Sequence, residues 1–206
     1  MEPAPYDSMI VEEDILSRAE RRRQQALVVL DKLGLMERWS HFGEPKIVGA
    51  VRYGLVVAPD IDLAIYSEHP QISHGFAVMS SLAEIPGVWK VRFSNELDRP
   101  DEGLYWQVRY IAGDATVWKV DNWLLSINHP QAQWDDRFAL ALEKALIPES
   151  RRAILKIKED TSGQEWAHGI DIYQAVMEGG VRSLTAFQEW LAAKPSEKLN
   201  YWLPSG

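Results

Sequence analysis

The stretch KIVGAVRYGLVVAPDIDLAIY, from Lys46 to Tyr66, is the part of the chain that decides the fold. In a β-strand, successive side chains point to opposite faces, so Asp60 and Asp62 would share one face while Ile61 and Leu63 fill the other. Two carboxylates on one strand face repel each other, and packing alone gives little reason to place them together. A divalent cation supplies a reason, because Mg²⁺ prefers oxygen ligands and can be held by two acidic groups together with a phosphate.

This stretch resembles the signature of the nucleotidyltransferase superfamily related to DNA polymerase beta, and especially that of its small bacterial members. The signature is an apolar residue, Gly-Ser, a loop of about ten residues and then Asp-x-Asp flanked by apolar residues. Here Gly49-Ala50 stands where Gly-Ser is expected, and Arg52-Tyr53-Gly54 resembles the Arg-Gly step that often follows. Asp60-Ile61-Asp62-Leu63 matches the acidic pair. The match is strong over this stretch and weak up to residue 125.

The resemblance also implies a third carboxylate on a later strand, and Asp121 in TVWKVDNWLL fits that position by its order in the chain. By resemblance, Asp60, Asp62 and Asp121 would be both the catalytic residues and the ligands of Mg²⁺ or Mn²⁺. Asp121 would help to activate the attacking hydroxyl as a metal ligand or general base. The implied reaction is an in-line displacement at the α-phosphorus of an NTP that releases pyrophosphate.

The nucleotide-binding residues implied by the resemblance are Gly49, Ala50 and Arg52. Ala50 departs from the family pattern, because it has no hydroxyl and cannot make the phosphate contact of the usual Ser. Backbone amides at the start of a helix can still hold a phosphate. Arg52 and Lys119 are further candidates for phosphate contacts, although basic side chains beside a strand are commonly just solvated.

The residues alone leave structural alternatives open. Asp60 and Asp62 could be a turn residue followed by one salt-bridged strand residue. Asp121 could be held by a neighbouring guanidinium, such as that of Arg92 or Arg109, since a carboxylate is rarely buried without a partner.

Composition restricts the class of protein. With 46% hydrophobic and 25% charged residues, the chain of 206 residues is typical of a globular protein able to bury an ordinary core. A net charge of -8 argues against a nucleic-acid partner. The absence of cysteine excludes disulfides and Cys-ligated zinc. No apolar run approaches the roughly 18 residues that cross a membrane, and no secretory signal is evident, so we expect a cytoplasmic protein.

The periodicities predict an α+β fold of about five strands with flanking helices, followed by a helical C-terminal part. The resemblance implies that the strands form a nucleotidyltransferase-like mixed sheet. The expected strands cover residues 46–51, 60–66, 88–95, 104–111 and 116–127, the last three as an antiparallel meander. The expected helices cover residues 8–33, 70–85, 134–146, 149–158, 170–177 and 184–192. The pattern changes near residue 130, which predicts a core of residues 1–130 and a helical region of residues 131–206.

Two functional hypotheses follow. In the first, the chain transfers a nucleoside monophosphate from an NTP to a hydroxyl of a small molecule or a protein, and four tryptophans of the C-terminal helices shape the acceptor side (Trp134, Trp166, Trp190 and Trp202). Relatives that modify antibiotics and relatives that act as antitoxins both fit. In the second, Ala50 marks a catalytically degenerate relative that binds a nucleotide or a protein partner without turnover.

Overall fold

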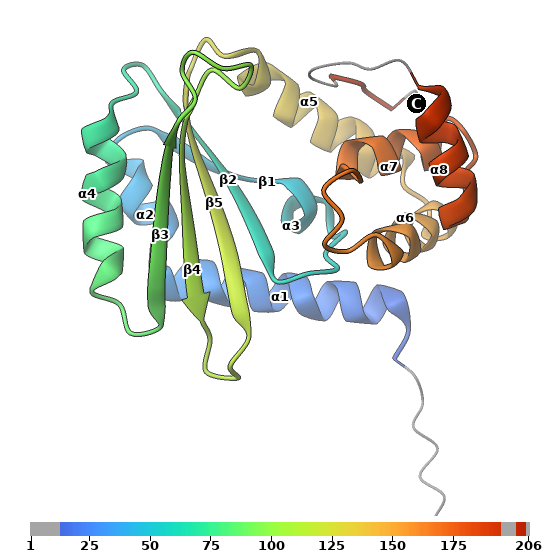
Figure 1. The fold of residues 1–206 in the computed structure, drawn as a ribbon, viewed down its shortest axis with the longest axis horizontal. Helices are drawn as coiled ribbons and strands as arrows, with labels where there is room; N and C mark the ends of the chain where they lie inside the picture. Colours follow the sequence, from blue (N-terminus) through green and yellow to red (C-terminus); the bar gives the residue numbers. More distant parts are fainter. Residues whose placement is uncertain (1–12, 195–200, 205–206) are drawn as a thin grey trace, which may run out of the picture.

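The computed structural model describes residues 13–194 and 201–204, which form a five-stranded mixed sheet with helices around it (Figure 1). The strands are β1 (Glu44–Val48), β2 (Asp60–Ser67), β3 (Val88–Asn95), β4 (Leu104–Ile111) and β5 (Val117–Ser126). The helices are α1 (Ile15–Leu33), α2 (Leu35–Ser40), α3 (Gly49–Tyr53), α4 (Ile72–Ala83), α5 (Pro130–Ala145), α6 (Pro148–Asp160), α7 (Gly169–Met177) and α8 (Leu184–Ala193). The predicted α+β class is confirmed.

The strand order β1-β2-β5-β4-β3 explains how distant parts of the chain meet. The strands β3, β4 and β5 form the predicted antiparallel meander, and β1 pairs antiparallel with β2. The strands β2 and β5 are parallel neighbours in the middle of the sheet. A parallel pair needs a long crossover, and here the crossover consists of α4 and the hairpin β3-β4. Consequently, residues 60–67 lie directly beside residues 119–126.

Helix α1 shows where the sequence pattern was most informative. Its apolar positions recur at helical spacing and bury Ala26, Leu30 and Leu33, and Gly34 ends it in the left-handed conformation with φ +58°. The part of the expected helix before residue 13 lies outside the described residues. The short helix α2 was not predicted, because a six-residue segment holds too little periodicity to be recognised.

The first strand ends earlier than expected. The predicted strand of residues 46–51 stops at Val48, and α3 begins at Gly49. The cause is the backbone of Gly49, whose φ of +62° is incompatible with an extended strand. Residues 49–51, read as strand, are thus the first turn of a helix, and this turn points the chain toward β2.

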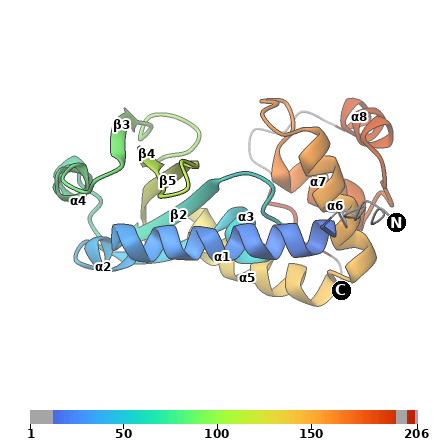
Figure 2. The same cartoon turned by 90° about the horizontal axis from the view of Figure 1, so that it is seen from below.

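The core consists of two apolar clusters. The first packs the sheet against α1, α2 and α4 and includes Leu30 and Trp106. The second lies among α5–α8 and includes Phe138, but it also takes Ala19 from α1 and Leu55 from the segment after α3. Helix α1 therefore extends from the sheet to the helical part (Figure 2). The predicted boundary near residue 130 stays a prediction. Within the described ranges, no helix has the length and apolar character required to cross a membrane.

Candidate active site

Parallel pairing of β2 with β5 brings the three predicted carboxylates together. The register sets Asp62 opposite Asp121 and Asp60 opposite Lys119. One carboxylate oxygen from each of Asp60, Asp62 and Asp121 lies within 4.8 Å of the others. The i,i+2 spacing in DID places the carboxylates of Asp60 and Asp62 on one face of β2. The crossover brings β5 alongside β2, and β5 carries the third carboxylate, about sixty residues later in the chain.

Gly49 makes room for this cluster. Its strand neighbour Val48 pairs with Asp62, so the turn into α3 runs beside that carboxylate. A Cβ built on Gly49 would lie 2.5 Å from Oδ2 of Asp62, closer than any van der Waals contact allows. Glycine is therefore needed here both for its positive φ and for the close approach of the backbone to the acidic pair.

Without a bound cation, the ionised carboxylates of this cluster are destabilised by burial and by their mutual repulsion. Burial raises the pKa of Asp62 to about 7, with added contributions from the charges of Asp60 and Asp121. Burial also raises the pKa of Asp60, against the opposing effect of Lys119. Oδ1 of Asp60 is buried, and no group in the described part of the chain hydrogen-bonds to it. An all-oxygen donor set with an unpartnered buried oxygen fits Mg²⁺ or Mn²⁺.

Asp121 is the most firmly held of the three. Tyr105 donates its hydroxyl to Oδ1 of Asp121 at 2.8 Å, and Gln107 donates to the same oxygen at 3.2 Å. Nζ of Lys119 lies 2.9 Å from Oδ2 of Asp121 and 2.9 Å from Oδ2 of Asp60. The expected alternative partner Arg109 bonds to Gln107 instead. Asp121 is thus paired, but by a lysine that also reaches the acidic pair.

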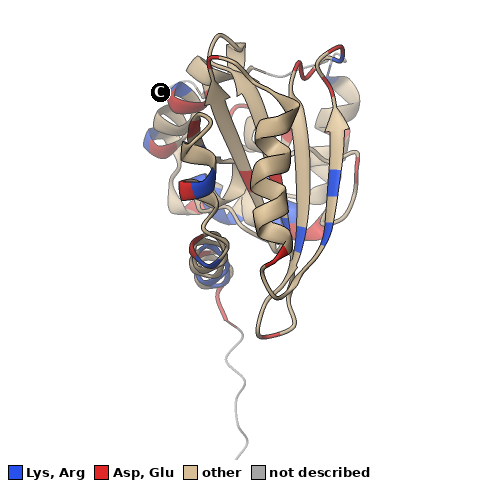
Figure 3. Cartoon of the chain, turned by 90° about the vertical axis from the view of Figure 1, so that its left-hand side faces the viewer, with Lys and Arg blue, Asp and Glu red and all other residues tan. Residues whose placement is uncertain are grey.

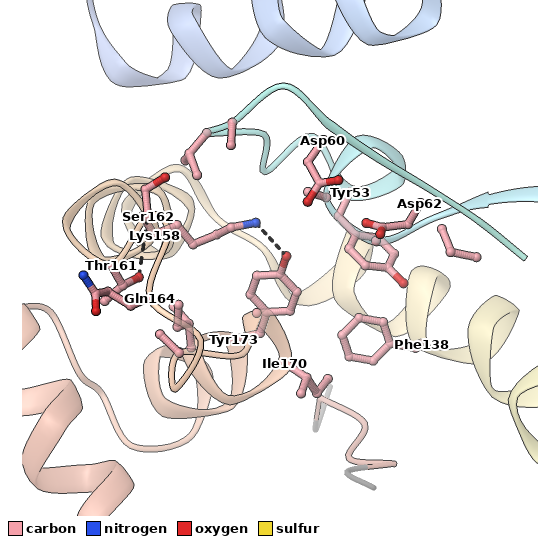
Figure 4. Close-up of a pocket in the computed structure, with 18 of the residues that line it drawn as sticks. Tyr53, Asp60, Asp62, Phe138, Lys158, Thr161, Ser162, Gln164, Ile170 and Tyr173 are labelled. Carbon is pink, nitrogen blue, oxygen red and sulfur yellow. Dashed lines mark hydrogen bonds between the residues drawn. The ribbon is translucent and has the colours of Figure 1, made fainter. Parts of the chain in front are cut away.

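A cavity of about 480 Å³ opens beside Asp60 and Asp62, a size suited to a small ligand. One wall comes from the β1–α3 turn and β2. The facing wall comes from α5, α6 and α7 (Figure 4). The residues that line the cavity include Ala50, Tyr53, Asp60, Asp62, Lys158 and Tyr173.

Lys158 is the principal cation of the facing wall, and the sequence did not identify it. Its ammonium donates to the carbonyl of Leu55 at 2.8 Å. It also donates to the hydroxyl of Tyr173 at 3.3 Å (Figure 4). Burial lowers the pKa of Lys158 to about 8, although the charges of Asp62 and Asp60 oppose this shift. In the sequence it is one of several charged residues in an amphipathic helix, and nothing local separates it from its solvated neighbours.

Not every expected residue reaches the cavity. Gly49 and Ala50 line it, whereas Arg52 does not and donates to Oδ1 of Asp136 at 2.8 Å. Of the four tryptophans expected to shape the acceptor side, Trp134 lines the cavity. The other three are absent from its lining, while Trp123 on β5, which was not predicted, is present.

Comparison with known proteins gives a result at the level of structure. No protein-family model and no curated protein matches the chain. A mutant of the Cid1 poly(U) polymerase bound to MgATP aligns with a TM-score of 0.56 and 15% identity, over 77% of this chain and 50% of that one. These enzymes belong to the nucleotidyltransferase superfamily related to DNA polymerase beta. The fold is a nucleotidyltransferase fold.

Two other proteins share this nucleotidyltransferase fold with the chain. A cytoplasmic RNA terminal U-transferase aligns with a TM-score of 0.54 and 14% identity, over 77% of this chain and 47% of that one. The GLD-2/RNP-8 complex aligns with a TM-score of 0.53 and 14% identity, over 88% of this chain and 69% of that one. The chain therefore spans about half the length of the poly(U) polymerase and the U-transferase.

Proposed function

We propose that the chain is a metal-dependent nucleotidyltransferase that transfers a nucleoside monophosphate from an NTP to a hydroxyl group. The observation that carries this proposal is the set of three carboxylates, whose oxygens lie within 4.8 Å of one another, at the edge of a cavity of about 480 Å³. The nucleotidyltransferase fold is consistent with it.

The acidic side of the site would hold the metal and orient the acceptor. Asp60, Asp62 and Asp121 would bind Mg²⁺ or Mn²⁺, which supplies positive charge to the phosphate oxygens. Asp121 is held by Tyr105 and Lys119, so its carboxylate is positioned to accept the proton of the acceptor hydroxyl. The hydroxyl oxygen forms a bond to the α-phosphorus while the bond from that phosphorus to the pyrophosphate oxygen breaks.

The remaining walls would bind the nucleotide. The backbone of Gly49 and Ala50 lies along the cavity next to Asp62, where phosphates would approach the metal. Lys158 provides positive charge on the facing wall. The rings of Tyr53 and Tyr173 give flat apolar surfaces for the base and sugar. Arg52 acts indirectly in this proposal, by holding Asp136 of α5 beside α3.

The chain also supports a second candidate, in which the site binds a nucleotide without turnover. The observation in its favour is Ala50, which lines the cavity without a hydroxyl at the position where the family signature has Ser. Such a protein would bind the Mg-nucleotide complex but release no pyrophosphate with any acceptor.

Thermal stability with each NTP, with and without Mg²⁺ or Mn²⁺, tests the site. A ligand that binds the native state raises the melting temperature by mass action. We expect a metal-dependent rise for the wild type and none for Asp60→Asn/Asp62→Asn. Asp31→Asn/Asp98→Asn is the matched control, because it removes the same charge from exposed positions.

The outcomes separate the candidates. A shift lost in the site variant but kept in the control supports nucleotide binding at the carboxylates, and pyrophosphate release with an acceptor then distinguishes enzyme from binder. The absence of any shift for all NTPs, or a shift that survives in Asp60→Asn/Asp62→Asn, would contradict the proposed site.

A further inference from the structure

Basic side chains continue outward from the acidic cluster along one row of the sheet. Asp60 on β2 is paired with Lys119 on β5, Lys119 is paired with Arg109 on β4, and Arg109 is paired with Lys90 on β3. Residues paired across strands point to the same face. Three consecutive strands beyond Asp60 thus present a cation on the face that carries the carboxylates.

The next row of the sheet ends in a fourth cation. Asp62 is opposite Asp121, Asp121 is opposite Gln107, and Gln107 is opposite Arg92. Because this row is two residues from the first along each strand, it lies on the same face. We call the face formed by Lys90, Arg92, Arg109 and Lys119 the basic face.

The third row adds aromatic rings to this face. Trp123 is opposite Tyr105, and their ring centroids are 4.7 Å apart. Both side chains are partly exposed, and Trp123 also lines the cavity beside Asp60 and Asp62. The basic face therefore adjoins an aromatic pair at the mouth of the candidate active site.

Packing does not account for the basic face. The opposite face of these strands carries the buried core residues Trp106 and Val108, whereas Lys90 and Arg92 are exposed. No salt bridge joins Lys90, Arg92 or Arg109 to a carboxylate among the residues that the structure describes. Figure 3 shows the Lys and Arg segments on neighbouring strands.

The cations would also repel one another. Like charges directly opposite in a sheet are destabilising, and Arg109 is opposite Lys90 on one side and Lys119 on the other. Charged residues on an edge strand protect against aggregation, which could explain Lys90 and Arg92 on β3. That explanation does not cover Arg109, which lies on the inner strand β4.

We propose that the basic face binds the sugar-phosphate backbone of a single-stranded nucleic acid, with the 3′ hydroxyl of that strand directed to the carboxylates. The inference rests on the proposed function and names the acceptor class. From β5 to β3 the cations extend over two strand spacings, about 10 Å. This reach suits successive phosphodiesters better than the single phosphate of a small acceptor.

The aromatic pair of Tyr105 and Trp123 also suits a single-stranded nucleic acid. Bases of single strands stack on exposed aromatic side chains beside a basic groove, without sequence preference. The net charge of -8 argued against nucleic acid at the level of the whole chain. The local arrangement reverses that argument for this face, because the field near a bound strand depends on the nearest charges, and salt screens those beyond about 10 Å.

The direct test is binding of a short fluorescent single-stranded oligoribonucleotide, measured by anisotropy over a range of salt concentrations. The variant is Lys90→Gln/Arg92→Gln/Arg109→Gln. The control is Lys32→Gln/Lys144→Gln/Lys156→Gln, which removes the same charge from exposed positions on α1, α5 and α6. Both variants keep the carboxylates.

We expect the basic-face variant to bind at least about ten-fold more weakly than the control. Its plot of log affinity against log salt should lose about 2 units of slope, since each neutralised phosphate contributes about 0.7 for a single strand. Equal affinities in the two variants, or no binding by the wild type, would overturn the inference.

Nucleotide binding separates failure of this inference from failure of the proposed function. The NTP-dependent thermal shift is measured on the same proteins and is expected to be equal in the wild type and both variants. A normal shift without oligoribonucleotide binding would point to a small-molecule or protein acceptor and overturn only the inference. The absence of an NTP-dependent thermal shift in the wild type would overturn the proposed function itself.

Discussion

The two walls of the candidate active site differ in how they are built. The acidic wall comes from β2, β5 and the β1–α3 turn, and its side chains are placed by strand register. The facing wall comes from helices of the C-terminal part, and its cation Lys158 is placed by packing between α6 and α7.

This difference determines which substitutions each wall should tolerate. On the acidic wall, Gly49, Asp60 and Asp62 are crowded, so small changes of shape should be severe. On the helical wall, Lys158 is held by one carbonyl and one hydroxyl, so changes of charge should matter more than changes of shape.

The largest effect is expected for Gly49→Ala on the acidic wall. The added Cβ would lie 2.5 Å from Oδ2 of Asp62, in addition to the strain of a φ of +62°. Gly180→Ala is the matched control, since Gly180 has a φ of +63° and no atom within 4 Å of the added Cβ. We expect both variants to lose on the order of 1–3 kcal/mol of stability through backbone strain.

Only Gly49→Ala should also lose the metal-dependent NTP shift and at least about 100-fold of any transfer activity. The measurements are thermal shift and pyrophosphate release. Equal behaviour of the two variants would show that the close approach to Asp62 is unimportant.

The next effect concerns the cost of burying the acidic pair. In the unfolded chain an Asp ionises near pH 3.9, whereas in the folded protein the pKa of Asp62 is raised to about 7. Between these values the folded state holds the extra proton. The stability contributed by this group is therefore present below about pH 4 and is lost as the pH rises through 7, by on the order of 4 kcal/mol.

Asp62→Asn cannot ionise and therefore removes this loss of stability with rising pH. In metal-free buffer the variant should be more stable than the wild type at pH 8 and nearly equal to it at pH 4, as measured by urea unfolding. The exposed Asp98→Asn serves as the control. A variant less stable than the wild type at pH 8 would contradict the expected electrostatic cost.

The helical wall should show a pH dependence of NTP affinity, which arises from the loss of a positive charge. The pKa of Lys158 is lowered to about 8 by burial, so its positive charge is lost as the pH rises through that value. NTP affinity should therefore fall by roughly ten-fold between pH 7.5 and 9, a range that lies above the pKa of about 7 of Asp62.

Lys158→Arg stays charged and should flatten this dependence, while Lys158→Met should bind weakly throughout. Calorimetric titration of Mg-NTP at several pH values provides the measurement. If the affinities of wild type and Lys158→Met change in parallel with pH, the dependence arises elsewhere.

The smallest effect is expected for Ala50→Ser. Ala50 lines the cavity with Gly49, and a serine there restores the hydroxyl of the family signature. One added hydrogen bond to a charged phosphate is worth about 1.5–3 kcal/mol at most, and partial alignment should reduce the gain to a few-fold in NTP affinity. Ala50→Val has no hydroxyl and separates this gain from a simple change of size.

The acidic wall could be predicted from sequence because it depends on local rules. DID places two carboxylates on one face, whereas the turn at Gly49 was missed because residues 49–51 were expected to continue the strand. Asp121 was found by resemblance and by its position within an apolar strand. Four of the five strands, β2 to β5, were predicted to within one residue at each end for the same reason, since alternation and turn residues are read over short windows.

The helical wall could not be predicted, because its geometry depends on packing between distant segments. Lys158 meets the carbonyl of Leu55 over a separation of 103 residues. Likewise, Arg52 was expected at the phosphates but is turned toward Asp136 on α5. The basic face was missed for a related reason: its residues are unremarkable along the chain and form a row only once the strand order is known.

The path of α1 has a consequence for folding. Its C-terminal half packs on the sheet, but its N-terminal half contributes Ala19 to the helical cluster, and Arg18 pairs with Glu159 across 141 residues. The partner Glu159 of this first half is therefore synthesised 141 residues after Arg18. Until α6 forms, the first half of α1 lacks its helical partners, so the packing of α1 is completed only after a contact of long sequence separation has formed.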